Sequence, residues 1–193
     1  MVKPLAQMPL FEGYGNNRMP LGSYAVLMGV YGTSLAGYLA WRGGRGKAPL
    51  PRLGLDDLLL FGLATHKITR IVGRDFVTAP LRAPFVRFKS KDRASELNEE
   101  SRGQGLRRAV GDLISCTFCL GPWVAGAFMA VHAVRPRETR LVASIFALTT
   151  LSDFLHRGYE WVGQGLKRTR ERAQLVERAS KKSEEKSDPA PAH

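Results

Sequence analysis

Apolar positions along the chain are gathered into long uncharged stretches that alternate with segments rich in charge. Residues 21–41 read LGSYAVLMGVYGTSLAGYLAW and contain no ionisable side chain other than tyrosine. At about 1.5 Å per residue, a helix of this length crosses the roughly 30 Å hydrocarbon core of a bilayer. Its small residues are typical of helix interfaces in membranes, whereas glycine destabilises a helix in water. We therefore predict a membrane span at residues 21–41 rather than a soluble core helix.

A second apolar stretch covers residues 113–134, and its only strongly polar side chain, His132, lies near its end. Pro122 interrupts this stretch and is predicted to kink a helix. Membrane proteins tolerate such a kink when neighbouring backbone, serine or threonine groups form hydrogen bonds with the backbone groups that the kink leaves unpaired. The pattern therefore predicts a kinked span.

A third stretch begins at residue 141, and its uncharged part ends at Asp153. Continuation to residue 161 places Tyr159 and Trp161 at the membrane interface, where these residue types are enriched. Asp153 would then lie inside the membrane near its exit, paired or facing a polar cavity. We predict a span at residues 141–161.

Residues 55–72 allow two interpretations, because their charge-free run is only about half as long as a bilayer core is thick. The segment could span with Lys67 and Arg70 reaching to the surface, or it could lie in the interface. Spanning is favoured. Asp56 and Asp57 diverge on a helix and suit capping of its start better than paired catalysis.

The pattern as a whole predicts an all-α integral membrane protein with three or four transmembrane helices. We expect an N-terminal leader at residues 1–20, a helical membrane domain at residues 21–161 and a charged C-terminal tail at residues 162–193. Residues 167–193 alternate charge and end in KKSEEKSDPAPAH, so the tail is expected to be partly helical at its start and disordered over its last dozen residues.

The overall composition does not by itself indicate a membrane protein, whereas the positions of the charged residues do. The mean hydropathy of -0.17 and the 44% apolar content are ordinary for a globular protein, because the charged segments offset the apolar stretches. With four spans and a cytoplasmic N-terminus, twenty lysines and arginines flank the inside and seven the outside. With three spans and an external N-terminus, the basic link that follows the first span also lies inside. Both arrangements place the large central loop and the C-terminus in the cytoplasm.

We accordingly expect an inner-membrane protein without a cleaved signal peptide, since the first apolar run is longer than a signal core and starts late.

The net charge of +12 raises nucleic-acid binding as an alternative. No zinc-finger, helix-turn-helix or RNA-binding aromatic signature accompanies this charge, which argues against it. Residues 81–93 interleave phenylalanine and valine with basic side chains that include Arg87 and Lys89. This pattern favours contact with anionic lipid headgroups, and a solvated basic loop is the alternative.

The two cysteines, Cys116 and Cys119, form a CxxC motif followed by Leu-Gly-Pro-Trp. Such a pair can act as a redox couple or provide half of a metal site. Tetrahedral zinc would need two further ligands, and His66 is a weak candidate. A cytoplasmic position predicts reduced thiols, so a permanent disulfide is not expected. Small buried packing residues are the favoured interpretation.

No nucleophile–base pair, phosphate-binding glycine loop or paired carboxylates stand out, so we predict no catalytic residue and no cofactor.

Two blocks of the sequence resemble the bacterial membrane proteins grouped as domain of unknown function 1360. In residues 57–85, an apolar helix runs into Ala-Thr-His-Lys-Ile-Thr-Arg, then Arg-Asp and Pro-Leu-Arg-Ala-Pro-Phe. Residues 116–124 are similar to that family's Cys-x-x-Cys-x-Gly-x-Trp pattern at the start of a hydrophobic helix. The resemblance covers residues 55–151 and implies a short helical membrane protein of unestablished function, some members being associated with sporulating bacteria. It also groups the following residues for joint testing: Arg70, Asp75, Arg82, Cys116 and Cys119.

Three functions follow as hypotheses. The favoured one is a membrane-anchored structural or interaction protein whose partners are the bilayer, anionic lipids, a second copy or another membrane protein. The second is a thiol or metal-binding membrane protein using Cys116 and Cys119 with His66. The third is a small transporter component using Lys67, Arg70 and Asp153 as intramembrane charges. The charged residues to which we assign headgroup contact or a structural role are Lys67, Arg70, Asp75, Arg82, Arg87, Lys89 and Asp153.

Overall fold

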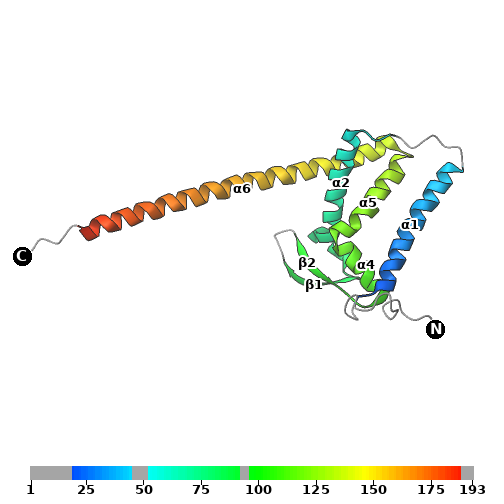
Figure 1. Ribbon diagram of the computed structural model, residues 1–193, viewed down its shortest axis with the longest axis horizontal. Coiled ribbons are helices and arrows are strands. Elements are labelled where there is room, and N and C mark those ends of the chain that lie inside the picture. The colour runs from blue at the N-terminus through cyan, green and yellow to red at the C-terminus, as the bar shows by residue number, and fades with distance from the viewer. Residues whose placement is uncertain (1–18, 45–51, 92–95, 188–193) are drawn as a thin grey trace, which may run out of the picture. The chain divides into compact units, whose positions relative to one another are not determined.

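A computed structural model describes residues 19–44, 52–91 and 96–187 of the chain. Residues 1–18, 45–51, 92–95 and 188–193 lie outside the described residues, and with them most of the predicted leader and the end of the predicted tail. The described chain is mostly helical (Figure 1). Its elements are α1 (Leu21–Gly43), α2 (Leu55–Arg74), the 3-10 helix η3 (Phe76–Thr78), α3 (Ala79–Arg82), β1 (Val86–Lys91), β2 (Leu97–Ser101), α4 (Gly105–Ser115), α5 (Thr117–His132) and α6 (Pro136–Ser187).

The chain divides into two units, residues 1–150 and residues 151–193. The first contains α1 to α5, the hairpin and the first part of α6. The second contains the rest of α6, whose side chains are almost all exposed where they are described. A long exposed helix with interspersed charges is typical of solvated helical segments. The predicted tail at residues 162–193 falls within this second unit, and its helix continues to Ser187.

The core of the first unit lies between α2 and α5. Phe61 of α2 and Phe128 of α5 pack with their ring centroids 5.5 Å apart, and His132 lies edge-on to Phe61 at 5.0 Å. Ala64 and Ala143 are buried in the same cluster. Alanine at these positions lets the helix backbones approach closely, so a small cluster of buried side chains suffices to join three helices.

Helix α1 lies on the other side of α5 and is held there by hydroxyl groups (Figure 1). Tyr24 donates to a carboxylate oxygen of Asp112 at 2.5 Å, and Tyr38 donates to the backbone carbonyl of Ala130 at 2.8 Å. Tyr31 makes a longer bond of 3.3 Å to the carbonyl of Pro122. These tyrosines recur every seven residues, which places them on one face of α1. The sequence contains this regular spacing, but our sequence reasoning did not use it.

The apolar stretch at residues 113–134 differs from the kinked span that we predicted. The helix breaks at Cys116, where the backbone is extended, and α4 and α5 meet there at a bend of 83°. Pro122 lies inside α5 without ending it. As the sixth residue of α5, Pro122 lacks the N–H that would otherwise donate to the carbonyl of Phe118, so one hydrogen bond of the helix is missing there.

Within the described residues, the helices taken singly are either too short or too polar for a membrane crossing, and α4 with α5 meets the length and composition criterion only as a bent pair. The three or four predicted spans therefore stay a prediction, although each of them coincides with helical structure over most of its residues.

The mostly helical structure agrees with the predicted all-α class, and a two-stranded antiparallel hairpin is an additional element that we did not predict. Strand β1 pairs with β2, and Arg87 lies opposite Glu100 while Phe88 lies opposite Glu99. Opposite charges facing each other across strands stabilise such a pair. Our sequence reasoning treated residues 81–93 as a basic segment on its own and did not consider the acidic residues that follow as its partner strand.

Close packing between the hairpin and α4 yields a test. A Cβ atom at Gly111 would lie 2.6 Å from the backbone oxygen of Phe85, whereas one at Gly121 would have no neighbour within 4 Å. We expect Gly111→Ala to lower the free energy of unfolding by about 1–3 kcal/mol through overpacking. Gly121→Ala should instead raise it by about 0.5–1 kcal/mol through helix propensity. Thermal unfolding of the purified variants measures both, and equal midpoints would contradict the packing described here.

Candidate functional site

Helix α2 ends at a junction that turns the chain into η3 and α3. The helix stops after Arg74 because Asp75 is extended, with φ -72° and ψ 148°. The hydroxyl of Thr78 donates to the backbone carbonyls of Ile71 and Asp75, and the carbonyl of Ile71 also accepts the backbone N–H of Asp75 at 3.3 Å. The turn is therefore fixed by a side chain that caps the exposed end of α2.

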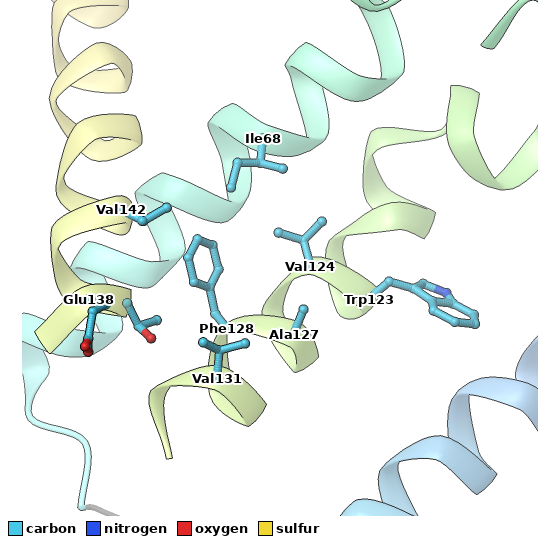
Figure 2. A pocket seen from close by; sticks show the side chains of 9 residues that line it. Ile68, Trp123, Val124, Ala127, Phe128, Val131, Glu138 and Val142 are labelled. Carbon is cyan, nitrogen blue, oxygen red and sulfur yellow. The ribbon is translucent and has the colours of Figure 1, made fainter. Parts of the chain in front are cut away.

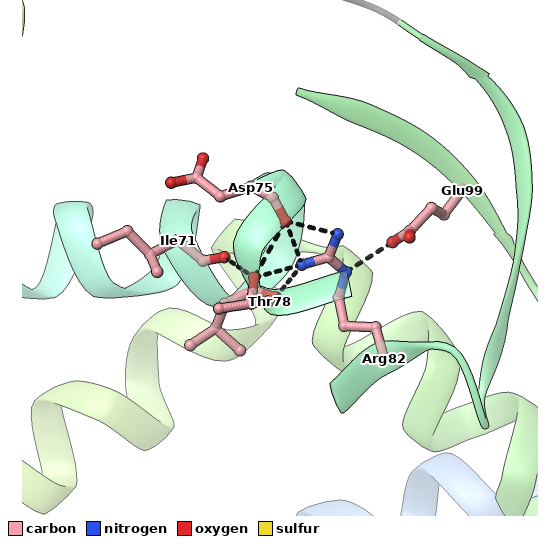
Figure 3. Close-up of polar contacts among 6 residues, drawn as sticks. Ile71, Asp75, Thr78, Arg82 and Glu99 are labelled. Carbon is pink, nitrogen blue, oxygen red and sulfur yellow. Dashed lines mark hydrogen bonds and ion pairs between the residues drawn. The ribbon is translucent and has the colours of Figure 1, made fainter. Parts of the chain in front are cut away.

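Arg82 fills the centre of this junction (Figure 3). Its Nη1 donates to the carbonyl of Val72 at 2.8 Å and to the hydroxyl of Thr78 at 2.6 Å, and both terminal nitrogens reach the carbonyl of Asp75 at 3.1 Å. Its Nε donates to a carboxylate oxygen of Glu99 at 2.6 Å. The guanidinium thus joins the end of α2 to strand β2.

This arginine is almost fully buried, with 1% of its surface exposed. A buried guanidinium is tolerated only when its charge is paired and its donors are satisfied. Glu99 supplies the charge, and the α2 carbonyls supply acceptors at the negative end of the helix dipole. The site is therefore a structural charge centre that depends on several elements at once.

Arg70 and Glu96 form a second ion pair beside the first. The backbone of Asp75 also pairs with Glu96 in an isolated antiparallel bridge. The main chain of Asp75 thus contacts Arg82 through its carbonyl and Glu96 through this bridge. The structure brings together three of the residues grouped by family resemblance, Arg70, Asp75 and Arg82, and adds two glutamates that our sequence reasoning missed.

The remaining predicted charges are placed differently. Arg87 and Lys89 are exposed on β1, Lys67 is half-buried on α2 and His66 is exposed there. Asp153 is half-buried on α6 and belongs to the second unit. The transporter hypothesis, which needs Lys67, Arg70 and Asp153 to act together, stays a prediction.

The two cysteines are joined as a disulfide, which corrects our expectation of reduced thiols. Cys116 caps the start of α5, and its Sγ accepts the backbone N–H of Cys119 at 3.2 Å. The Cα atoms are 5.2 Å apart, within the range that a disulfide requires. We expected reduced thiols because the cytoplasm is reducing, whereas the structure brings the two side chains together over one helical turn. Cys119 is exposed and Cys116 half-buried, so neither is the fully buried packing residue that we favoured.

Metal binding remains a hypothesis. Nowhere in the described ranges do three or more His, Cys, Asp or Glu side chains gather as a group that could hold a metal ion. Cys116, Cys119 and His66 therefore lack a completed donor set here.

A second charged junction lies at the opposite ends of the helices. Arg140 of α6 pairs with both Asp56 and Asp57 at the start of α2. A carboxylate oxygen of Asp57 also accepts the backbone N–H of Gly54 at 3.4 Å. The predicted capping role of Asp57 is confirmed, and the ion pair adds a link that sequence reasoning missed.

An apolar groove of about 490 Å³ lies between α2, α5 and the first part of α6 (Figure 2). Ile68 and Val142 face it from two sides, and Phe128 lies between them. Glu138 and Thr139 are its polar members. The rest of its lining is apolar or aromatic.

These features define a class, a small helical bundle with a charge centre at each end and a disulfide at the start of α5. The chain belongs to the family described as "Protein of unknown function (DUF1360)", whose profile matches residues 60–159. It is 29% identical over 102 residues to a protein named "Sporulation protein YjcA" from Bacillus subtilis (strain 168), covering 51% of this chain and 86% of that protein. No solved structure matches.

The buried arginine gives a test with a matched control. We expect Arg82→Gln to lower the free energy of unfolding by about 3–5 kcal/mol, because Glu99 would remain buried without its charge partner. Arg87→Gln, on the exposed face of β1, should change it by less than about 0.5 kcal/mol. Chemical unfolding of the two variants measures the difference. Similar midpoints would mean that Arg82 is not the centre of the junction.

Proposed function

We propose that this protein is a membrane-anchored structural or interaction protein whose helical bundle is embedded in the inner membrane. The observation that carries this proposal is the outward face of the bundle. Leu59 of α2 and Leu148 of α6 are 68% and 66% exposed, and large apolar side chains on α1 are exposed as well. Contiguous exposed apolar surface marks a membrane or protein interface.

The position of the polar groups supports the same proposal. The ion pair of Arg140 with Asp57 joins the starts of α6 and α2, and Arg42 at the end of α1 donates to the carbonyl of Ala133 after α5. The Arg82 centre lies at the other end of α2. Polar contacts thus concentrate at the two ends of the bundle, with apolar side chains between them, as expected of a bilayer-embedded bundle.

The contacts also favour one of the two orientations. Tyr24, near the start of α1, bonds to Asp112 of α4, so the N-terminal end of α1 lies at the same end of the bundle as the central basic segment. The arrangement with four crossings and a cytoplasmic N-terminus places both of them inside. The positive-inside rule favours this orientation because the central segment is rich in arginine and lysine.

Fractionation and accessibility mapping test this proposal. We expect the full-length chain to stay with membranes after an alkaline wash, since apolar helices hold an integral protein independently of charge. In a variant with both cysteines replaced by serine, single cysteines at positions 95 and 185 should react with an impermeant maleimide only from the cytoplasmic side. Single cysteines at positions 48 and 137 should react only from outside. A chain that stays in the supernatant, monodisperse without detergent, would contradict membrane anchoring.

A thiol redox protein is the second candidate, and the disulfide between Cys116 and Cys119 favours it. Oxidation of the dithiol would pass two electrons to an acceptor and release two protons. Reduction would free a Cys116 thiolate at the N-terminus of α5, where the helix dipole and the N–H of Cys119 stabilise negative charge.

The single-cysteine variants distinguish this candidate. We expect Cys116 in Cys119→Ser to react with iodoacetamide near neutral pH roughly tenfold faster than Cys119 in Cys116→Ser, because the N-terminus of α5 and the N–H of Cys119 stabilise the Cys116 thiolate. Ser115→Ala added to each variant controls for changes beside the motif. Equal rates, together with a disulfide that stays oxidised in cells under all growth conditions, would leave the pair a purely structural bridge.

A further inference from the structure

The short segment formed by η3 and α3 has its apolar and polar faces reversed relative to a helix in water. Val77 and Leu81, one helical turn apart, are 88% and 72% exposed, and Phe76 beside them is exposed too. Thr78 and Arg82, also one turn apart, point inward to the α2 end (Figure 3). A surface helix in water turns these residue types the opposite way.

The inward face is fixed by contacts already described. Arg82 is bonded to the α2 carbonyls and to Glu99, so rotating the segment to hide Val77 and Leu81 would expose these partners and break the ion pair. The outward apolar face is therefore a fixed consequence of the charge centre. A partner that covers this apolar face must bind apolar side chains over a small area.

Basic side chains follow this face along the chain. Strand β1 carries Arg87, Lys89 and Lys91, all exposed, and Phe88 among them is exposed as well. The segment connecting α3 to β1 is only residues 83–85, so the apolar face and the basic strand are close in space. An apolar face next to lysine and arginine is the combination that binds anionic lipid surfaces.

We propose that Phe76, Val77 and Leu81 insert into the headgroup boundary of an anionic leaflet, while Arg87, Lys89 and Lys91 bind its phosphates. This inference rests on the proposed membrane function and deepens it by naming the lipid class and the inserting residues. It assigns α2 an exit at the cytoplasmic surface, where the chain turns to lie along the interface. The positive charge of β1 favours an anionic lipid surface over a second copy of this chain, since two copies of the basic strand would repel each other.

The test uses the full chain with both cysteines replaced by serine and a single cysteine at position 77 or 81. Glu100→Cys on β2 is the aqueous control, because Glu100 is exposed on a polar strand. Leu148→Cys on α6 reports on the bundle itself. The proteins are reconstituted in phosphatidylcholine vesicles with or without about one-third phosphatidylglycerol, and each cysteine is labelled with an environment-sensitive fluorophore. Quenching by lipids brominated near the headgroup or deep in the acyl chain measures depth.

We expect positions 77 and 81 to be quenched by the shallow bromines, more strongly in the anionic vesicles, and position 100 to remain unquenched. Replacing Arg87, Lys89 and Lys91 by glutamine should remove the dependence on anionic lipid. If position 148 is quenched and positions 77 and 81 behave like position 100, the interfacial inference fails and membrane anchoring stands. If position 148 also remains unquenched, membrane anchoring fails. Protection of position 77 from aqueous maleimide without quenching by lipid would identify a protein partner or second copy and overturn the inference.

Discussion

The structure of the first unit depends on a buried positive charge at the end of α2. Arg82 cannot remain buried unless several acceptors meet around it, and these come from α2, the turn after it and strand β2. This requirement fixes where α2 ends, how η3 and α3 are oriented and where the hairpin attaches. One guanidinium thereby positions segments that are distant in sequence.

The helices are joined by hydrogen bonds as well as by a small apolar core. In the described part of the chain only a few large side chains are buried, notably Phe61 and Phe128. Helix α1 is attached through tyrosine hydroxyls and α6 through Thr150, which donates to the carbonyl of Leu63. In water such bonds contribute modestly, because water competes for the same groups. A bundle of this kind leaves its larger apolar side chains facing outward, which is the basis of the proposed membrane function.

The family match runs from the second turn of α2 into the part of α6 that belongs to the second unit. The matched residues therefore include the disulfide and the two ion pairs at the end of α2, Arg70 with Glu96 and Arg82 with Glu99. They do not include α1. Helices α1, α2, α5 and the start of α6 were predictable, because each follows an apolar stretch whose length suits a helix and not a strand, whereas η3, α3 and the start of α4 were not predicted. The CxxC motif, the capping role of Asp57 and the grouping of Arg70, Asp75 and Arg82 were also found from sequence.

The sequence by itself determined where the main helices lie and where charge concentrates, since both follow from local composition and periodicity. Only the tertiary structure decided the roles of individual charges. Glu96 and Glu99 lie far from Arg70 and Arg82 along the chain, and the break at Cys116 falls inside an apolar stretch. Such choices arise from long-range contacts, in which the desolvation of one group must be offset by partners that local sequence patterns do not identify.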